Sequence, residues 1–111
     1  MAITNVGSGT TTPTIDVVST LDTNTVFGIY QAYINLTNLV KGDVIRVFVT
    51  TKVLTGDTEE TLFEAIYAND LIANSIVCTP PFVSEFSSSF KIEQTDGVAR
   101  AFPWAVYRLD S

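Results

Sequence analysis

The chain has 111 residues, a length typical of one domain, and 46% of them are hydrophobic against 16% charged. Six Lys and Arg stand against twelve Asp and Glu, so the formal charge is −6 and no basic stripe exists for nucleic acid or an anionic membrane. The absence of His removes the usual general base and the commonest metal ligand, and the single Cys78 cannot form an intrachain disulfide. We therefore expect no enzymatic activity, no cofactor, and neither nucleic acid nor a membrane as partner.

Residue types point to β structure. Thr, Val and Ile together make up about a third of the chain, and aromatic residues add 11%. β-branched and aromatic side chains fit the pleated, half-buried surface of a sheet. The composition, together with turn signals at short spacing, predicts an all-β, single-domain β-sandwich or jelly-roll-like fold with about seven or eight short antiparallel strands.

The first 14 residues are rich in Thr, Gly and Ser and show no sustained period. We expect residues 1–14 to form a flexible or partner-ordered N-terminal arm, followed by the β-sandwich domain at 15–111. The segment also lacks the basic end and apolar centre of a signal peptide, which predicts synthesis and folding in the cytoplasm.

The first half of the domain alternates clearly. We predict a short strand at 15–20, a polar turn at 21–25, and a strand at 27–36. A turn at 39–43 follows, in which Gly42 can take a positive φ. The strongest expected strand is 44–53. In 27–36, one face carries Tyr30, Ala32, Ile34 and Leu36, and the other carries Ile29, Gln31, Tyr33 and Asn35. In 44–53, the face predicted to be core carries Ile45, Val47, Val49, Thr51 and Val53.

The segment 59–68 is compatible with two structures. Asp57 and Glu60 fit a helix capping box, and apolar residues recur at helical spacing after them. The same residues also alternate as in a strand, which would form a simple hairpin with the strand before it. We favour the strand because the composition of the whole chain is typical of β proteins.

The rest of the chain reads as short strands and turns. Residues 69–74 are expected to form a polar loop or a turn of helix. Residues 75–78 are expected to form a short strand, in which Cys78 is a buried small hydrophobic residue. The Pro80-Pro81 pair ends the ladder because proline has no backbone N–H to donate. Further strands are expected at 86–93 and 102–109, with Asp96-Gly97 in a tight turn between them.

Acidic residues offer one candidate metal site. Asp57, Glu59 and Glu60 lie close in sequence, and calcium prefers oxygen ligands from acidic loops. Calcium needs six to eight such ligands, however, and the spacing does not fit an EF-hand. We therefore interpret these carboxylates as surface charge and predict no metal site.

The C-terminal segment 91–106, KIEQTDGVARAFPWAV, resembles the ending LKQTAGTGRxFPWxV of small proteins encoded among the structural genes of tailed bacteriophages. Its distinctive part is Arg100 followed by Phe102-Pro103-Trp104. Similar segments occur upstream in the same order, so that the resemblance covers about residues 26–109: Gly28–Gln31, Gly42–Val47 and Lys52–Thr58. Glu93 and Asp96 depart from the family ending, which puts an identical partner surface in doubt.

This resemblance implies a non-enzymatic virion structural protein, namely a capsid decoration or cement protein that binds and stabilises the assembled shell. Its implied partner is the major capsid protein, its implied location the capsid surface after synthesis in the host cytoplasm, and its implied assembly a homotrimer. The candidate interface residues are Arg100, Phe102, Pro103, Trp104, Tyr33 and Phe82.

Three points stay open at the level of sequence. Trp104 can fill the core or lie in an interface. A carbohydrate- or receptor-binding β-sandwich module, with exposed Tyr and Trp stacking on sugar rings, is one alternative function. A structural component of the phage tail or neck is another.

Overall fold

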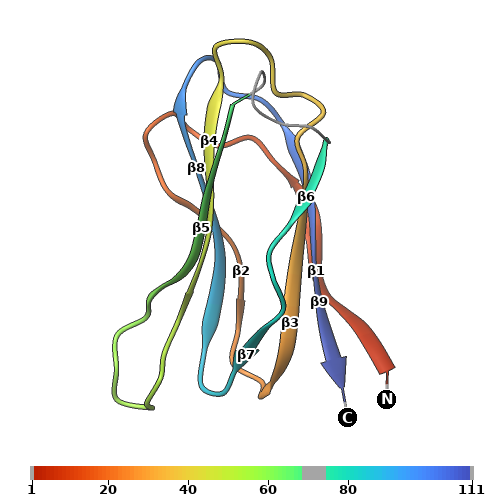
Figure 1. The fold of residues 1–111 in the computed structure, drawn as a ribbon, viewed down its shortest axis with the longest axis vertical. Helices are drawn as coiled ribbons and strands as arrows, with labels where there is room; N and C mark the ends of the chain where they lie inside the picture. Colours follow the sequence, from red (N-terminus) through yellow and green to blue (C-terminus); the bar gives the residue numbers. More distant parts are fainter. Residues whose placement is uncertain (1, 69–74, 111) are drawn as a thin grey trace.

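The computed structural model describes residues 2–68 and 75–110, which form two packed antiparallel sheets and contain no helix (Figure 1). The nine strands are β1 (Ala2–Thr11), β2 (Ser19–Asn24), β3 (Gly28–Asn35), β4 (Val44–Thr51), β5 (Glu60–Ala68), β6 (Ile76–Cys78), β7 (Phe82–Ser84), β8 (Ser88–Asp96) and β9 (Phe102–Asp110). One sheet has the order β1-β9-β3-β6, with β7 also pairing with β3, and the other has the order β2-β8-β4-β5. The predicted all-β sandwich is therefore confirmed, with nine strands rather than seven or eight in the described part of the chain.

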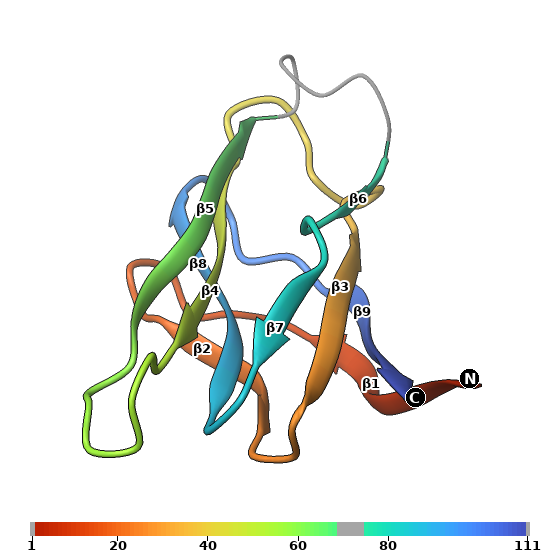
Figure 2. The same cartoon turned by 60° about the horizontal axis from the view of Figure 1, so that its bottom comes forward.

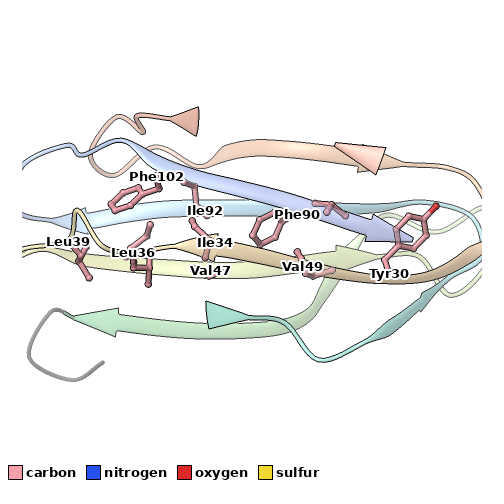
Figure 3. Close-up of a cluster of buried hydrophobic side chains, with 12 residues drawn as sticks. Tyr30, Ile34, Leu36, Leu39, Val47, Val49, Phe90, Ile92 and Phe102 are labelled. Carbon is pink, nitrogen blue, oxygen red and sulfur yellow. The ribbon is translucent and has the colours of Figure 1, made fainter. Parts of the chain in front are cut away.

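The core lies between the sheets and follows the predicted alternation. Tyr30, Ala32 and Ile34 of β3 all point inward and are at most 1% exposed. Figure 3 shows Tyr30 and Ile34 facing apolar side chains of the opposite sheet, among them Val47, Val49, Phe90 and Ile92. Thr51 is only half-buried, and Val53 lies outside β4 and is exposed, because the inward register ends where the strand does. This core holds the two sheets together by apolar burial.

Strand β5 settles the ambiguity at 59–68 in favour of the strand. It pairs with β4 from Val44↔Ala68 to Thr51↔Glu60, with a bulge near Val49. The helical spacing was misleading because Leu62 and Ile66, which would share a core-facing stripe, are 51% and 63% exposed. The ladder with β4 supplies the backbone hydrogen bonds that a lone helix would have to form internally.

The N-terminal segment is not an arm outside the sandwich. Residues Ala2–Thr11 form β1, an edge strand whose register with β9 runs from Ala2↔Asp110 to Thr11↔Phe102. None of its ten residues is fully buried, and this is why the sequence shows no apolar period. A strand held mainly by its backbone ladder needs no such period.

Two further boundaries differ from the prediction. The strand expected at 15–20 is wrong, because β2 begins at Ser19 and covers most of the segment expected to be a turn. Leu21 packs against the core and the backbone pairs with β8, so tertiary contacts override the polar local sequence. The short strand β7 was not predicted, and the loop expected at 69–74 lies outside the described residues.

Candidate interaction surfaces

Arg100 is half-buried and forms an ion pair with a buried carboxylate of its own chain. Its Nε donates to Asp43 Oδ2 at 3.0 Å, and Asp43 is only 2% exposed. The amides of Val40 and Val98 donate to the same carboxylate at 3.0 and 3.1 Å. Burial alone would raise the pKa of Asp43, but these backbone donors and the Arg100 guanidinium outweigh it and hold the pKa below its usual value. Arg100 therefore has a structural partner within its own chain.

The turn before Arg100 is fixed by Gln94, which is fully buried. Its Nε2 donates to the carbonyl oxygens of Val98 at 2.7 Å and Asp96 at 3.2 Å, while its Oε1 accepts the amide of Arg100 at 3.3 Å. Gly97 has φ +93, and a Cβ there would lie 1.9 Å from Asp43 Oδ1. We call Asp43, Gln94, Gly97 and Arg100 the turn lock, because they tie the β8–β9 turn to the β3–β4 connection.

Sequence reasoning missed Asp43 and Gln94. Both lie in the segments that carry the resemblance to phage proteins, and this is the signal that could have drawn attention to them. The positive φ expected at Gly42 is confirmed, at +96, and the predicted tight turn at Asp96-Gly97 is present. The residues of the turn lock therefore form contacts within the sandwich, although they belong to the segments that resemble phage proteins.

The other C-terminal candidates do not form one patch. Phe102 is 0% exposed and belongs to the core, so a partner cannot reach it in this conformation. Pro103 is exposed on the outer side of β9. Trp104 is half-buried, lies over Gly9, and donates its indole N–H to Thr11 Oγ1 at 3.1 Å. Trp104 thus anchors β1 from within the sandwich.

The remaining two candidates lie in different environments. Phe82 is half-buried and stacks on Tyr30 with ring centroids 6.0 Å apart. Tyr33 is 37% exposed and meets Tyr107 edge to face at 5.8 Å on the outer side of the five-stranded sheet. Of the six candidate residues, Tyr33 and Pro103 therefore have outward positions.

Tyr33 belongs to a broad uncharged surface. We define the aromatic face as the outward positions of β1, β9, β3, β6 and β7 that carry Ile3, Ile29, Gln31, Tyr33, Ile76, Val83, Ala105, Tyr107 and Leu109. A shallow groove of about 520 Å³ runs between Ile3, Tyr33, Ile76 and Tyr107. Within the described residues, no charged residue occupies an outward register position of this sheet.

The outer side of the four-stranded sheet is chemically opposite. Arg46 forms ion pairs with Glu93 at 2.9 Å and with Glu64 at 3.3 Å. Its guanidinium lies over the Phe48 ring, 3.8 Å from the ring centroid, and Phe48 is only 4% exposed. The charges of the two layers are therefore unevenly distributed: in residues 2–68 and 75–110, the outward register positions of the five-stranded sheet carry no charged side chain, whereas those of the four-stranded sheet do.

The sandwich is also open along one side. Near Gly7 and Asp22 the β1 and β2 edges approach closely, whereas β5 and β7 stay apart (Figure 2). A cleft of about 530 Å³ lies there, lined by Leu62 and Phe63 on one wall and by Phe82 and Val83 on the other. The lining of this cleft is mainly apolar, and its two ionisable side chains are Lys52 and Glu85.

The acidic cluster has separate structural roles. Glu59 accepts hydrogen bonds from Ser87 Oγ and from Thr50 Oγ1, the latter at 2.7 Å. Burial would raise the pKa of Glu59, but these hydroxyl donors and nearby Lys91 hold it below its usual value. Asp57 accepts the amide of Leu54 at 3.0 Å and closes the β4–β5 turn. In the described part of the chain, no three metal-ligating side chains lie together.

The prediction for Cys78 is wrong, because its side chain is exposed. Cys78 pairs with Tyr33 in the β3–β6 register and therefore points outward with it.

A search of residues 2–68 and 75–110 finds no helical segment that could span a membrane.

The fold defines the class of this protein as an antiparallel β-sandwich with one uncharged outer face. Comparison with protein-family models, curated proteins and solved structures finds no match to the chain. The resemblance to phage structural proteins therefore stays a prediction, and the functional argument rests on the surfaces described above.

Proposed function

We propose that this protein is a non-enzymatic structural component of a bacteriophage particle, a capsid decoration protein that binds the assembled shell through its aromatic face. The observation that carries the docking surface is the large uncharged layer around Tyr33 and Tyr107. Ile3, Ile76 and Val83 on this layer are 73%, 60% and 59% exposed. The phage context is supported by the resemblance of segment 91–106.

The physical argument concerns desolvation. A contact that buries this face removes no ionised side chain from water, so it avoids the penalty that buried unpaired charges impose. Tyr and large aliphatic side chains supply much of the contact energy in protein interfaces. Most of the face is built on β3, β6 and β9, whose backbones are already ordered by pairing, so less conformational entropy is lost on binding than with a flexible loop.

The test compares two isoleucines with similar exposure on opposite sides of the sandwich. Ile76 on the aromatic face is 60% exposed and Ile66 on the charged side is 63% exposed. Shells assembled from the coat protein of the same genome are sedimented with wild-type protein, with Ile76→Lys and with Ile66→Lys. We expect Ile76→Lys to weaken binding at least about tenfold, because it buries an unpaired ammonium, and Ile66→Lys to bind like wild type.

Two results would contradict the proposal. If the wild-type protein neither sediments with the shells nor occurs in purified virions, it is not a decoration protein. If Ile66→Lys loses as much binding as Ile76→Lys, the docking surface lies elsewhere.

A carbohydrate-binding function is the second candidate, and the Tyr33–Tyr107 pair favours it. The Tyr33 hydroxyl donates to Gln31 Oε1 at 3.2 Å, so an aromatic surface and an amide lie together beside the groove. Such a surface can stack on a sugar ring, and the Tyr33 hydroxyl oxygen can accept a hydrogen bond from a sugar hydroxyl, whereas Gln31 Nε2 already donates to the Thr79 carbonyl at 2.8 Å. A glycan array distinguishes the two functions. Sugar binding that Tyr33→Ala abolishes, with no binding to shells, would replace the decoration proposal.

A further inference from the structure

We propose that β1 is an exchangeable strand that leaves its own β9 and pairs in the same register with β9 of a second copy of the chain. Strand exchange is a low-cost route to an oligomer, because both arrangements use the same contacts. This inference concerns two identical chains and holds whether or not the protein decorates a capsid.

The first argument is how weakly side chains hold β1. Seven of its ten residues are exposed, and the remaining three, Val6, Gly7 and Thr11, are only half-buried. The strand is attached mostly through backbone pairing with β9, which runs from Ala2 to Thr11 with one interruption between Asn5 and Gly7. Detachment uncovers Val6, which packs against the core, and the part of Trp104 that lies over Gly9, but it removes no fully buried residue of β1, so it costs less than loss of a core strand would.

The second argument is the connection to β2. Residues 12–18 link an edge of one sheet to an edge of the other, and when extended they span about 23 Å. Within this connection Asp16 has φ +64, a conformation that is costly for a residue with a side chain. In the closed chain its amide is tied to the carbonyl of Gln94 at 2.9 Å. An open connection is free to release this conformation, which favours exchange.

The third argument is the surface that receives the strand. Without β1, strand β9 becomes the edge of its sheet and presents nine residues of backbone, from Phe102 to Asp110. Trp104 then lacks the contacts it makes with Gly9 and Thr11. An incoming β1 of identical sequence restores both the ladder and the indole hydrogen bond. In the exchanged state, Trp104 packs within the sandwich and also contacts a second chain.

Disulfide trapping tests this directly, because Ser8 and Ala105 are register partners in β1 and β9. The variant carries Ser8→Cys and Ala105→Cys in a Cys78→Ser background. A matched control carries Thr23→Cys and Ser89→Cys, whose side-chain oxygens lie 3.1 Å apart on β2 and β8. Both proteins are refolded from denaturant over a range of concentrations, oxidised, and separated on non-reducing denaturing gels.

We expect the β1–β9 pair to give disulfide-linked dimers or larger species whose fraction rises with protein concentration, while the control gives only internally linked monomer. Internally linked monomer alone from the β1–β9 pair, at every concentration, would overturn the proposal. An aromatic-face oligomer without exchange also gives that result, since its β1 stays on its own β9.

A second measurement covers the case in which the double variant does not fold. Chains carrying only Ser8→Cys are mixed with chains carrying only Ala105→Cys, both with Cys78→Ser, and the mixture is co-refolded. Exchange predicts a disulfide between the two kinds of chain, whereas strands that stay in their own sandwich leave the two cysteines on separate molecules. Absence of the mixed disulfide refutes the exchange independently.

Discussion

We expect Gly97→Ala to lower the free energy of unfolding by an amount that can be worked out from the structure, because Gly42→Ala provides a matched control. Both glycines have positive φ, +93 and +96. A Cβ at Gly42 meets nothing within 4 Å, whereas a Cβ at Gly97 would lie 1.9 Å from Asp43 Oδ1 and 2.8 Å from Asp43 Cα. The two substitutions therefore share the backbone penalty and differ in what happens to the turn lock.

The backbone penalty for an L residue in the left-handed region is about 1–2 kcal/mol, and we expect Gly42→Ala to cost this amount. Gly97→Ala must in addition displace the Asp43 carboxylate from its donors on Val98 and Arg100. Breaking a buried ion pair costs about 3–5 kcal/mol, and the lower end applies because the Arg100 side chain is 32% exposed. The expected total for Gly97→Ala is about 4–5 kcal/mol, a gap of about 3 kcal/mol between the variants.

Urea unfolding monitored by fluorescence of Trp104, the only tryptophan, measures both costs. For a domain of this size, a gap of about 3 kcal/mol separates the urea midpoints by at least about 1 M. Equal costs for the two variants would refute the reasoning, because they would show that the Asp43 interactions contribute no stability beyond the glycine conformation.

Three other predictions follow from single contacts. Because the pKa of Asp43 is lowered in the folded state, its ionised form contributes stability that is complete above the unfolded pKa of about 3.9 and is lost as the pH falls through the folded pKa. Asp43→Asn should therefore flatten the acid limb of a curve of unfolding free energy against pH. An unchanged slope would contradict this role of Asp43. Phe102→Ala should cost about 3–5 kcal/mol in urea unfolding, while exposed Pro103→Ala should stay within about 0.5 kcal/mol, and similar costs for both would place Phe102 outside the core. Trp104→Phe removes the indole donor to Thr11 and should cost about 1 kcal/mol. Relative to wild type, amide hydrogen exchange should become faster in β1 than it does in β3, and an equal change in both strands would show that the bond does not hold β1.

The sequence predicted the strands that carry their own apolar alternation. In β3, inward Tyr30, Ala32 and Ile34 alternate with outward residues, so a period of two was visible without any knowledge of the partner strands. The predictions failed where pairing rather than side-chain burial stabilises the strand. In β1 all the side chains are exposed or half-buried, so a Thr- and Gly-rich segment looked like a mobile arm.

The candidate site was less predictable than the fold. Arg100, Phe102, Pro103 and Trp104 are neighbours in sequence, but the pleat and the turn send them to a buried ion pair, the core, the outer surface and the β1 contact. The aromatic face combines side chains from five strands, and no local pattern reveals that their outward positions share a lack of charge.

By itself, the sequence determined that this protein is an all-β domain, because strand propensity and alternation are local properties of the chain. Only the tertiary structure decided which side chains are available to a partner, since this depends on register and on which strands become neighbours. Asp43 and Arg100 are 57 residues apart and meet only when the β3–β4 and β8–β9 turns pack together. Likewise, Tyr33 and Tyr107 form a surface only because β3 and β9, which lie far apart in the sequence, pair with each other.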